Sequence, residues 1–242
     1  MKTAYVTGAD RGLGFALART LLERGYNVYA GQYMPEWNEL DALKAQYADR
    51  LTVLPLDISS LAQVNAAAQA IAQNETSLDL LCNVAGVSGK AGNGTILDPF
   101  GEEDYEAIRR YYDVNTLGPL RVTRSVIDLI LKGEGKAVVT ISSEAGSVGG
   151  NWRKGGYGYC MSKAALNMQS AILQHSLAEH GVKVLCLHPG WLRSYMRGEL
   201  NEEATDDPAD VANRIAGLLE SKIWMDPASP MYLDYRGIPL AY

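Results

Sequence analysis

Hydrophobic residues along the chain fall into two alternating patterns, short β-rich runs and longer stretches of helical period. Residues 3–7 form a β-rich run that ends at a glycine, and Leu13, Leu17 and Leu21 then repeat along one face of a predicted helix at 13–24. Further β-rich runs occupy residues 27–31, 51–56, 78–82, 137–141, 182–187 and 231–233. Helical patterns separate these runs at 39–47, 61–73, 105–131, 159–180 and 208–219. This alternation predicts an α/β fold, a single doubly wound parallel sheet flanked by helices on both faces.

Two features refine this prediction. Gly118-Pro119 interrupts the long helical stretch, and the run at 78–82 is nearly all apolar, which suits a strand buried on both faces. No internal repeat, low-complexity tract or linker divides the chain. We therefore expect one domain spanning residues 1–242.

Composition narrows the classes of function. The chain has 242 residues, 47% of them hydrophobic, and a formal net charge of −6. No run of Lys and Arg is dense enough to follow a phosphate backbone, so we expect no nucleic-acid partner. Cys82, Cys160 and Cys186 are widely spaced, as reduced thiols are, and the three histidines lack partners at metal-ligand spacing. With no signal-peptide pattern and no apolar run of about 18 residues, we expect a cytoplasmic protein without metal or membrane contact.

A glycine-rich turn follows the first predicted strand. Gly8, Gly12 and Gly14 lie between that strand and the first helix, where glycines let the backbone approach a diphosphate and the helix N-terminus binds it. Their spacing is Gly-x-x-x-Gly-x-Gly, which departs from the Gly-x-Gly-x-x-Gly fingerprint. The position between a strand and a helix nevertheless favours cofactor binding over an ordinary turn.

Tyr159 and Lys163 stand four residues apart at the start of a helical pattern. Residues at this spacing share one helix face, whereas Tyr157 would face away. A phenol has an ordinary pKa of about 10, and a cation beside it favours the phenolate and lowers that pKa. Such a pair is more often a solvated helix face, so the rest of the chain decides between acid–base chemistry and packing.

Taken together, these motifs resemble those of the short-chain dehydrogenase/reductase family. The matching motifs, in order, are Thr-Gly-x-x-x-Gly-x-Gly at 7–14, Asn-x-Ala-Gly at 83–86, Asn115, Ser143, Tyr159-x-x-x-Lys163 and Pro189-Gly190. Residues 155–168 and 232–237 are similar to the C-factor-like branch of carbonyl reductases. The resemblance covers essentially the whole chain and implies a Rossmann-type fold that binds NAD(P).

The resemblance also implies the catalytic roles. Tyr159 would be the general acid that protonates the carbonyl oxygen during hydride transfer, or the base in the reverse reaction. Lys163 would lower the pKa of Tyr159 and hold the nicotinamide ribose. Ser143 would hydrogen-bond the substrate oxygen, and Asn115 would anchor a water that links Lys163 to solvent. Strand alternation allows only one of Ser142 and Ser143 to face the site, and the family pattern favours Ser143.

Further residues are expected to contact the cofactor. The full predicted set is Gly8, Asp10, Arg11, Gly12, Leu13, Gly14, Gln32, Asp57, Ile58, Asn83, Ala85, Gly86, Tyr159, Lys163, Pro189, Gly190, Leu192 and Ser194. Asp57 would accept a hydrogen bond from the adenine amine, with a loop or helix-capping carboxylate as its alternative. Val84 replaces an asparagine and Ser194 replaces a threonine that are common in the family.

The choice between NADP and NAD depends on the end of the second strand. Gln32 stands where NAD enzymes of this type have an aspartate, and Tyr33 stands where NADP enzymes often have an arginine. Arg11 can neutralise a 2′-phosphate, and Gln32 does not repel one as a carboxylate would. We therefore favour NADP over NAD.

The sequence thus predicts an oxidoreductase that interconverts a small carbonyl compound and an alcohol, as a homodimer or homotetramer by resemblance. The alternatives are a cofactor-binding sensor or signalling protein, and an α/β protein without a ligand. Arg153 and Lys154, in the loop before Tyr159, are interpreted as a solvated face rather than an anion site. Trp152 and Trp191 either wall a substrate pocket or serve ordinary packing.

Overall fold

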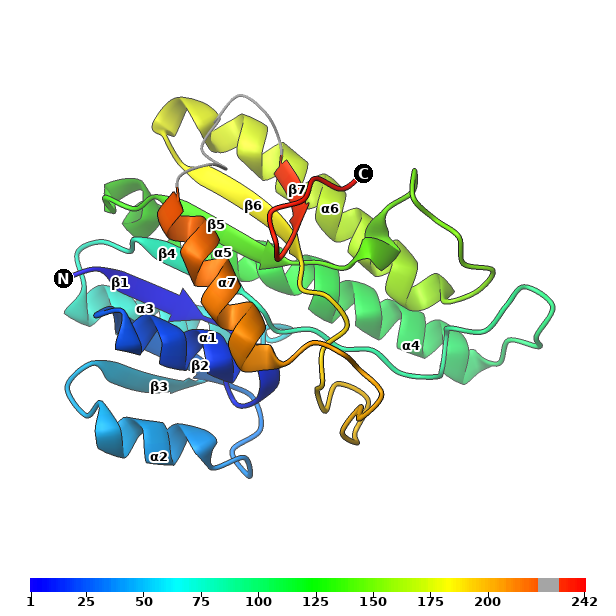
Figure 1. Cartoon of the computed structure of the whole chain (residues 1–242), viewed down its shortest axis with the longest axis horizontal. Coiled ribbons are helices and arrows are strands. Elements are labelled where there is room, and N and C mark those ends of the chain that lie inside the picture. Colours follow the sequence, from blue (N-terminus) through cyan, green and yellow to red (C-terminus); the bar gives the residue numbers. More distant parts are fainter. Residues whose placement is uncertain (222–230) are drawn as a thin grey trace.

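The computed structural model describes residues 1–221 and 231–242, and its centre is a parallel β-sheet (Figure 1). Across the described ranges the sheet has seven strands in the order β3-β2-β1-β4-β5-β6-β7. Their bounds are β1 (Thr3–Val6), β2 (Asn27–Gln32), β3 (Leu51–Pro55), β4 (Leu80–Asn83), β5 (Ala137–Ile141), β6 (Lys183–His188) and β7 (Met231–Asp234). All neighbouring pairs are parallel, which confirms the predicted doubly wound sheet.

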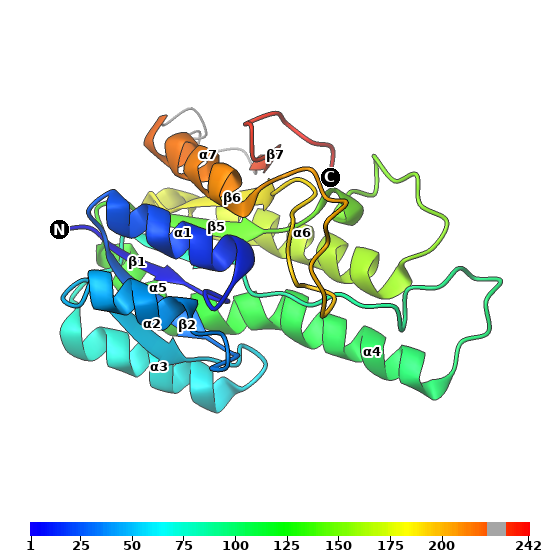
Figure 2. The same ribbon diagram turned by 60° about the horizontal axis from the view of Figure 1, so that its bottom comes forward.

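Helices cover both faces of the sheet (Figure 2). One face carries α1 (Gly12–Glu23), α2 (Glu39–Gln46) and α7 (Pro208–Ser221). The other carries α3 (Leu61–Asn74), α5 (Gly118–Lys132) and α6 (Tyr157–Leu177). Helix α4 (Glu102–Tyr112) packs on α6, and the short turns are η1 (Asp113–Leu117), η2 (Glu144–Gly146) and η3 (Ala178–His180). Within the described residues, no helix is both long and apolar enough to cross a membrane.

Strand residues alternate between the two helical layers. In β1, Ala4 and Val6 pack with α1, whereas Tyr5 points into the layer of α3 and α5. All three side chains are buried, because a central parallel strand is covered on both faces. Full burial of a large apolar side chain such as Leu17 contributes about 1.5–3 kcal/mol, so the two layers fix the sheet from both sides.

Two predicted boundaries shift for physical reasons. The strand predicted at 78–82 is found at Leu80–Asn83, directly after Asp79, whose backbone already bonds to Thr3 and Ala137 and whose carboxylate accepts hydrogen bonds from the N–H groups of Thr3, Glu134 and Gly135. The helix expected at 159 begins at Tyr157, because Gly156 adopts a left-handed conformation with φ of 86° at the N-cap.

The order of the strands places a crevice at the carboxyl end of the sheet. The chain builds outward from β1 to β3 and then crosses back to β4 on the other side of β1. The chain therefore leaves the carboxyl ends of β1 and β4, which lie toward the right in Figure 1, for helices on opposite faces of the sheet, α1 and α5. Open α/β sheets bind their ligands at such a switch point.

Two paired tyrosines give a test of the core. Tyr5 and Tyr29 are register partners in β1 and β2, but only the Tyr29 hydroxyl has a hydrogen-bond partner among the described residues, Oε1 of Glu75 at 3.2 Å. We expect Tyr5→Phe to leave the free energy of unfolding unchanged or to raise it by up to about 1 kcal/mol, because a buried unpaired hydroxyl is removed. Tyr29→Phe should lower it by about 1 kcal/mol. Urea unfolding checks both, and equal losses in the two variants would contradict this view of Tyr5.

Candidate active site

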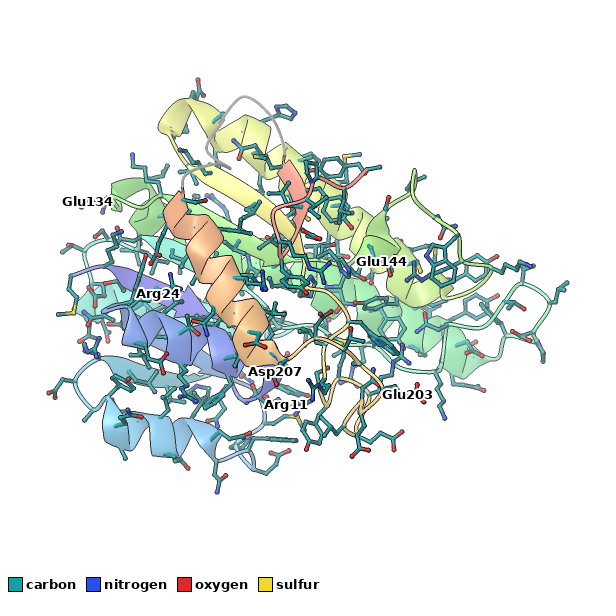
Figure 3. All side chains as sticks on the ribbon, in the orientation of Figure 1. Arg11, Arg24, Glu134, Glu144, Glu203 and Asp207 are labelled. Carbon is teal, nitrogen blue, oxygen red and sulfur yellow. The ribbon has the colours of Figure 1, made fainter. Side chains whose placement is uncertain are left out.

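A cavity of about 1220 Å³ opens at the carboxyl ends of the strands. Its walls come from the segments after β1, β3, β4, β5 and β6 and from the start of α6. Most predicted site residues line it: Gly8, Asp10, Arg11, Gly12, Leu13, Gly14, Asp57, Ile58, Ala85, Gly86, Ser143, Tyr159, Lys163, Pro189, Gly190, Leu192 and Ser194. Figure 3 labels Arg11 after β1, Glu144 after β5, and Glu203 on the long segment between β6 and α7. Segments far apart in the sequence thus form one cavity.

The glycine turn forms the tightest part of this cavity. Gly8 has φ of 62°, and a Cβ there would lie 2.8 Å from Cα of Ala85. A Cβ on Gly14 would lie 2.0 Å from the carbonyl oxygen of Gly8. The Thr7 hydroxyl accepts hydrogen bonds from the N–H groups of Val84 at 3.0 Å and Ala85 at 3.1 Å. The glycines therefore allow an approach of backbone segments that any side chain would prevent.

The start of α1 fits a diphosphate. Gly12 is its first residue, and Arg11 at the N-cap makes no side-chain capping hydrogen bond within the described chain. First-turn N–H groups of such a helix need outside partners, and the positive end of the helix dipole points the same way. This donor set suits the diphosphate of a nicotinamide dinucleotide.

Tyr159 and Lys163 lie one helical turn apart at the start of α6, as their spacing predicts. Lys163 is buried, its Nζ donates to the backbone carbonyl of Ile141 at 2.9 Å, and it lies 5.8 Å from the centroid of the Tyr159 ring. Ser142 and Ser143 both line the cavity with Tyr159. The Ser142 hydroxyl donates to Oδ1 of Asn167 at 2.5 Å, whereas the Ser143 side chain acts to lower the pKa of Tyr159.

Burial changes the acid–base properties of this group. Burial raises the pKa of the Tyr159 hydroxyl above its ordinary value, while the hydrogen bond with Ser143 and the charge of Arg197 act in the opposite direction. Burial also lowers the pKa of Lys163 to about 8. We expected Lys163 to lower the pKa of Tyr159, but the net shift is upward. Desolvation of the phenol is the larger effect, and the lysine Nζ donates to the Ile141 carbonyl.

Asn115 lies beside the cavity rather than on its lining. Its Oδ1 accepts from the N–H of Val87 at 2.8 Å, and its Nδ2 donates to the Val87 carbonyl at 2.9 Å and to the Ser162 hydroxyl at 3.1 Å. A Cβ on Gly86 would lie 3.3 Å from Oδ1 of Asn115 and 3.7 Å from Nζ of Lys163. Asn115 thus fixes the segment after β4 next to the lysine, and its role as a water anchor stays a prediction. It belongs to the π-helical turn η1, a feature frequent at functional sites.

Gln32 and Asn83 are likewise absent from the described lining of the cavity. The Gln32 amide donates to the Trp37 carbonyl at 3.2 Å, and the Asn83 amide donates to the Thr123 hydroxyl at 3.0 Å. Asp57 does line the cavity, and its Oδ1 also accepts from the N–H and hydroxyl of Ser59 at 2.8 and 2.6 Å. The Asp57 carboxylate therefore stabilises its own loop, as expected if Asp57 is a loop carboxylate.

Several neighbours hold Arg11 where the cavity meets the segment after β2. Its guanidinium lies 4.9 Å from the centroid of the Trp37 ring and 3.8 Å from the Asp10 carboxylate, and it contacts the sulfur of Met34. Asp10 is buried and accepts a hydrogen bond from the backbone N–H of Tyr33 at 3.1 Å. The arginine is thus oriented toward the end of β2, where the two cofactors differ.

Two supports of the site were missed by sequence reasoning. The Tyr232 hydroxyl on β7 donates to the carbonyl oxygen of Ser143 at 2.6 Å, a contact that no local signal reveals. Arg153 pairs through two nitrogens with the Glu144 carboxylate, one of them at 2.7 Å, and stacks 4.5 Å from the Trp152 ring centroid. This pairing lowers the pKa of Glu144. The interpretation of Arg153 as part of a solvated face is wrong, because the arginine ties its loop to the residue after Ser143.

Groups of three or more His, Cys, Asp and Glu side chains that could hold a metal ion are absent from the described residues. The cavity lining includes the hydroxyls of Tyr159 and Ser143 and the ammonium group of Lys163.

Comparisons with known proteins agree with this geometry. A family model described as short chain dehydrogenase matches residues 2–205. The chain is 38% identical over 191 residues to 1-hydroxy-2-glutathionyl-2-methyl-3-butene dehydrogenase of Rhodococcus sp. strain AD45, covering 78% of this chain and 77% of that protein. It is 34% identical over 161 residues to C-signal of Myxococcus xanthus, covering 66% and 90%.

Solved structures with the same architecture include an NADPH-bound carbonyl reductase from chicken fatty liver. It matches with a TM-score of 0.87 and 27% identity, over 100% of this chain and 99% of that one. A short-chain dehydrogenase/reductase from Burkholderia multivorans with bound NADP matches with a TM-score of 0.85 and 27% identity, over 100% and 99%.

The glycine turn yields a prediction with a matched control. Gly8 and Gly25 both adopt positive φ, but a Cβ on Gly25 would meet nothing within 4 Å. Gly25→Ala should therefore cost only about 1–2 kcal/mol of stability. Gly8→Ala should in addition weaken dinucleotide binding at least about tenfold, because the turn must move away from Ala85. Fluorescence titration of the dinucleotide, with circular dichroism to confirm folding, checks this; unchanged affinity in a folded Gly8→Ala protein would refute it.

Proposed function

Because the chain belongs to the short-chain dehydrogenase/reductase family, we propose that it reduces a ketone or aldehyde with NADPH, the reverse reaction being alcohol oxidation. The observation that carries this proposal is the meeting of Tyr159, Ser143 and Lys163 in the cavity that the glycine turn also lines. A dinucleotide bound along the turn would reach the same space as these three side chains. A sensor would need the turn but not this proton-donating group, so we place turnover first.

The protein's part in the reaction is to position and protonate the substrate. The bound cofactor supplies the hydride. The Ser143 hydroxyl and the Tyr159 phenol, which line the same cavity, would both bind the carbonyl oxygen. Because burial raises the pKa of Tyr159, the phenol carries its proton at neutral pH and can donate it as negative charge develops on that oxygen.

Lys163 would hold the nicotinamide ribose next to the tyrosine. Its Nζ has one hydrogen bond to a backbone carbonyl and an ammonium group has three donors, so two remain for ribose hydroxyls. Burial lowers the pKa of Lys163 to about 8, and a bound negative charge would favour its charged form. Lys163 would therefore hold the bound cofactor next to Tyr159 and place a positive charge beside the proton donor.

We propose NADP as the preferred cofactor. Arg11 lines the cavity at the end of β2, and the side chain that ends this strand, Gln32, is uncharged. A 2′-phosphate would thus meet a cation oriented by Trp37 and no carboxylate from the strand end. NADP is bound in the Burkholderia relative of known structure and NADPH in the chicken enzyme, which supports the same choice.

We also propose that residues 1–242 act as one domain, in the cytoplasm, as a homodimer or homotetramer. All three cysteines are free, in keeping with a reducing compartment. Met168 and Ile172 of α6 are 63% and 56% exposed, and Leu120 of α5 is 41% exposed. Large apolar side chains exposed on these helices support an association of copies through this layer.

The assignment of the proton donor is tested by a pair of neighbouring tyrosines. Tyr159→Phe should lower kcat by about 100- to 10,000-fold and leave NADPH binding unchanged, because only the proton donor is removed. Tyr157→Phe is the control, since that ring packs against Phe100 with centroids 6.2 Å apart and should keep its activity. NADPH consumption across a carbonyl panel measures both, and full turnover in Tyr159→Phe would sink the proposal.

Cofactor preference is tested at Arg11. Arg11→Ala should raise the KM for NADPH by about tenfold to a hundredfold and that for NADH by about twofold at most, because only NADPH carries the 2′-phosphate. Arg19→Ala is the control on α1, since Arg19 is exposed and pairs with Glu23 at 2.9 Å. Equal increases for both cofactors in Arg11→Ala would exclude this role.

A further inference from the structure

A second cavity of about 400 Å³ adjoins the first at Tyr159. Both cavities are lined by Ser88, Tyr159, Arg153 and Arg197, so the proposed proton donor stands where they meet. We call this second space the side cavity. A molecule whose carbonyl lies at Tyr159 can therefore extend a substituent into it.

The lining of the side cavity has a one-sided charge. It includes three cations, Lys90, Arg153 and Arg197, and no carboxylate from the described residues. The Glu144 carboxylate neutralises Arg153, but Lys90 and Arg197 form no salt bridge in the described part of the chain. The whole protein carries a formal charge of −6, so a local excess of cations is not a consequence of composition.

The start of α6 adds to this positive potential. Gly156, its N-cap residue, lines the side cavity, and the helix runs for 21 residues behind it. The N–H groups of Gly158 and Tyr159 are already taken by the Gly92 carbonyl and by Oδ1 of Asn93. The helix therefore contributes the positive end of its dipole rather than free donors.

The charge of Arg197 also reaches the reacting groups. Arg197 lines both cavities together with Tyr159, and its charge acts to lower the pKa values of Tyr159 and of Tyr111 on α4. The segment between β6 and α7, which carries Arg197, projects past the strand ends toward α4 in both views of the ribbon (Figures 1 and 2). An anion bound by Arg197 would thus lie beside the reacting carbonyl and on the same molecule.

We propose that the side cavity binds an anionic group, a carboxylate or a phosphate, carried by the carbonyl substrate itself. The proposal rests on the carbonyl reduction proposed above and names its substrate class. A guanidinium fork matches the paired oxygens of either anion, and Lys90 adds a point charge. A space of 400 Å³ holds roughly a dozen waters, so the anionic substituent has several non-hydrogen atoms.

The test compares acids with their neutral esters. A series of ω-oxo carboxylates and ω-oxo phosphonates of increasing chain length is assayed with NADPH, each beside its neutral ester, the methyl ester of the carboxylate or the dimethyl ester of the phosphonate. We expect kcat/KM for the anion to exceed that for its ester by at least about tenfold at the best chain length, and the advantage to shrink with added salt. The better series identifies which anion is bound. Equal values for every acid and ester overturn the proposal.

Variants locate the effect. Arg197→Gln and Lys90→Gln should each lower the acid-to-ester ratio by about tenfold, because each removes a charge-assisted contact. Lys132→Gln is the control, since this exposed lysine ends α5 near the amino ends of β4 and β5, away from the cavity, and should leave the ratio unchanged. A ratio that survives loss of both Arg197 and Lys90 places the anion elsewhere and rejects the side cavity.

A binding measurement separates this inference from the proposed reaction. Isothermal titration of the same acids and esters is carried out on the full chain with NADP⁺, so that no carbonyl is reduced. Acid-selective binding that is lost in Arg197→Gln supports the anion site even where no carbonyl is turned over, and that outcome rejects only the reaction. Turnover without acid-selective binding or kinetics rejects the anion site and leaves the reaction in place.

Discussion

The close contact between the glycine turn and the segment after β4 is the constraint on which the site depends. A Cβ at Gly8 would come within 2.8 Å of Cα of Ala85, and the Thr7 hydroxyl accepts from two N–H groups of that same segment. β1 and β4 meet only because the chain crosses the sheet after β3. The strand order thus brings the start of α1 against the segment after β4, and together they form the floor of the cavity. A side chain at the turn would push these segments apart.

The catalytic side of the cavity is built from long-range ties of the same kind. Lys163 joins α6 to the end of β5 through the Ile141 carbonyl, and Tyr232 joins β7 to the carbonyl of Ser143. The pair of Glu144 and Arg153 then anchors the loop that leads into α6. These ties orient Tyr159 without contacting the reacting atoms. Desolvation shifts both groups toward their neutral forms, since it raises the pKa of Tyr159 and lowers that of Lys163.

Sequence reasoning succeeded where the deciding information is local. The alternation of strands and helices, the glycine turn and the four-residue spacing of Tyr159 and Lys163 are set within short windows, and the structure contains all of them. It reached less far where the direction of a side chain depends on packing. The Asn83 side-chain amide donates to the Thr123 hydroxyl of α5, and the place of Asn83 along the cofactor stays a prediction. Tyr232 could not be found at all, because its partner is 89 positions away and is reached only through the pairing of β6 with β7.

The net charge of the chain and the charges that line the cavity bear on different kinds of ligand. A formal charge of −6 argues against a polyanion that must cover a broad surface, because such binding sums over many phosphates. A cofactor phosphate or a substrate carboxylate meets only a few side chains, within a cavity that water screens poorly. Arg11 lines one part of this space, and Arg197 with Lys90 lines the side cavity next to Tyr159. An acidic protein can therefore select anionic small molecules, since the sign of the potential inside the cavity is set by the residues that line it.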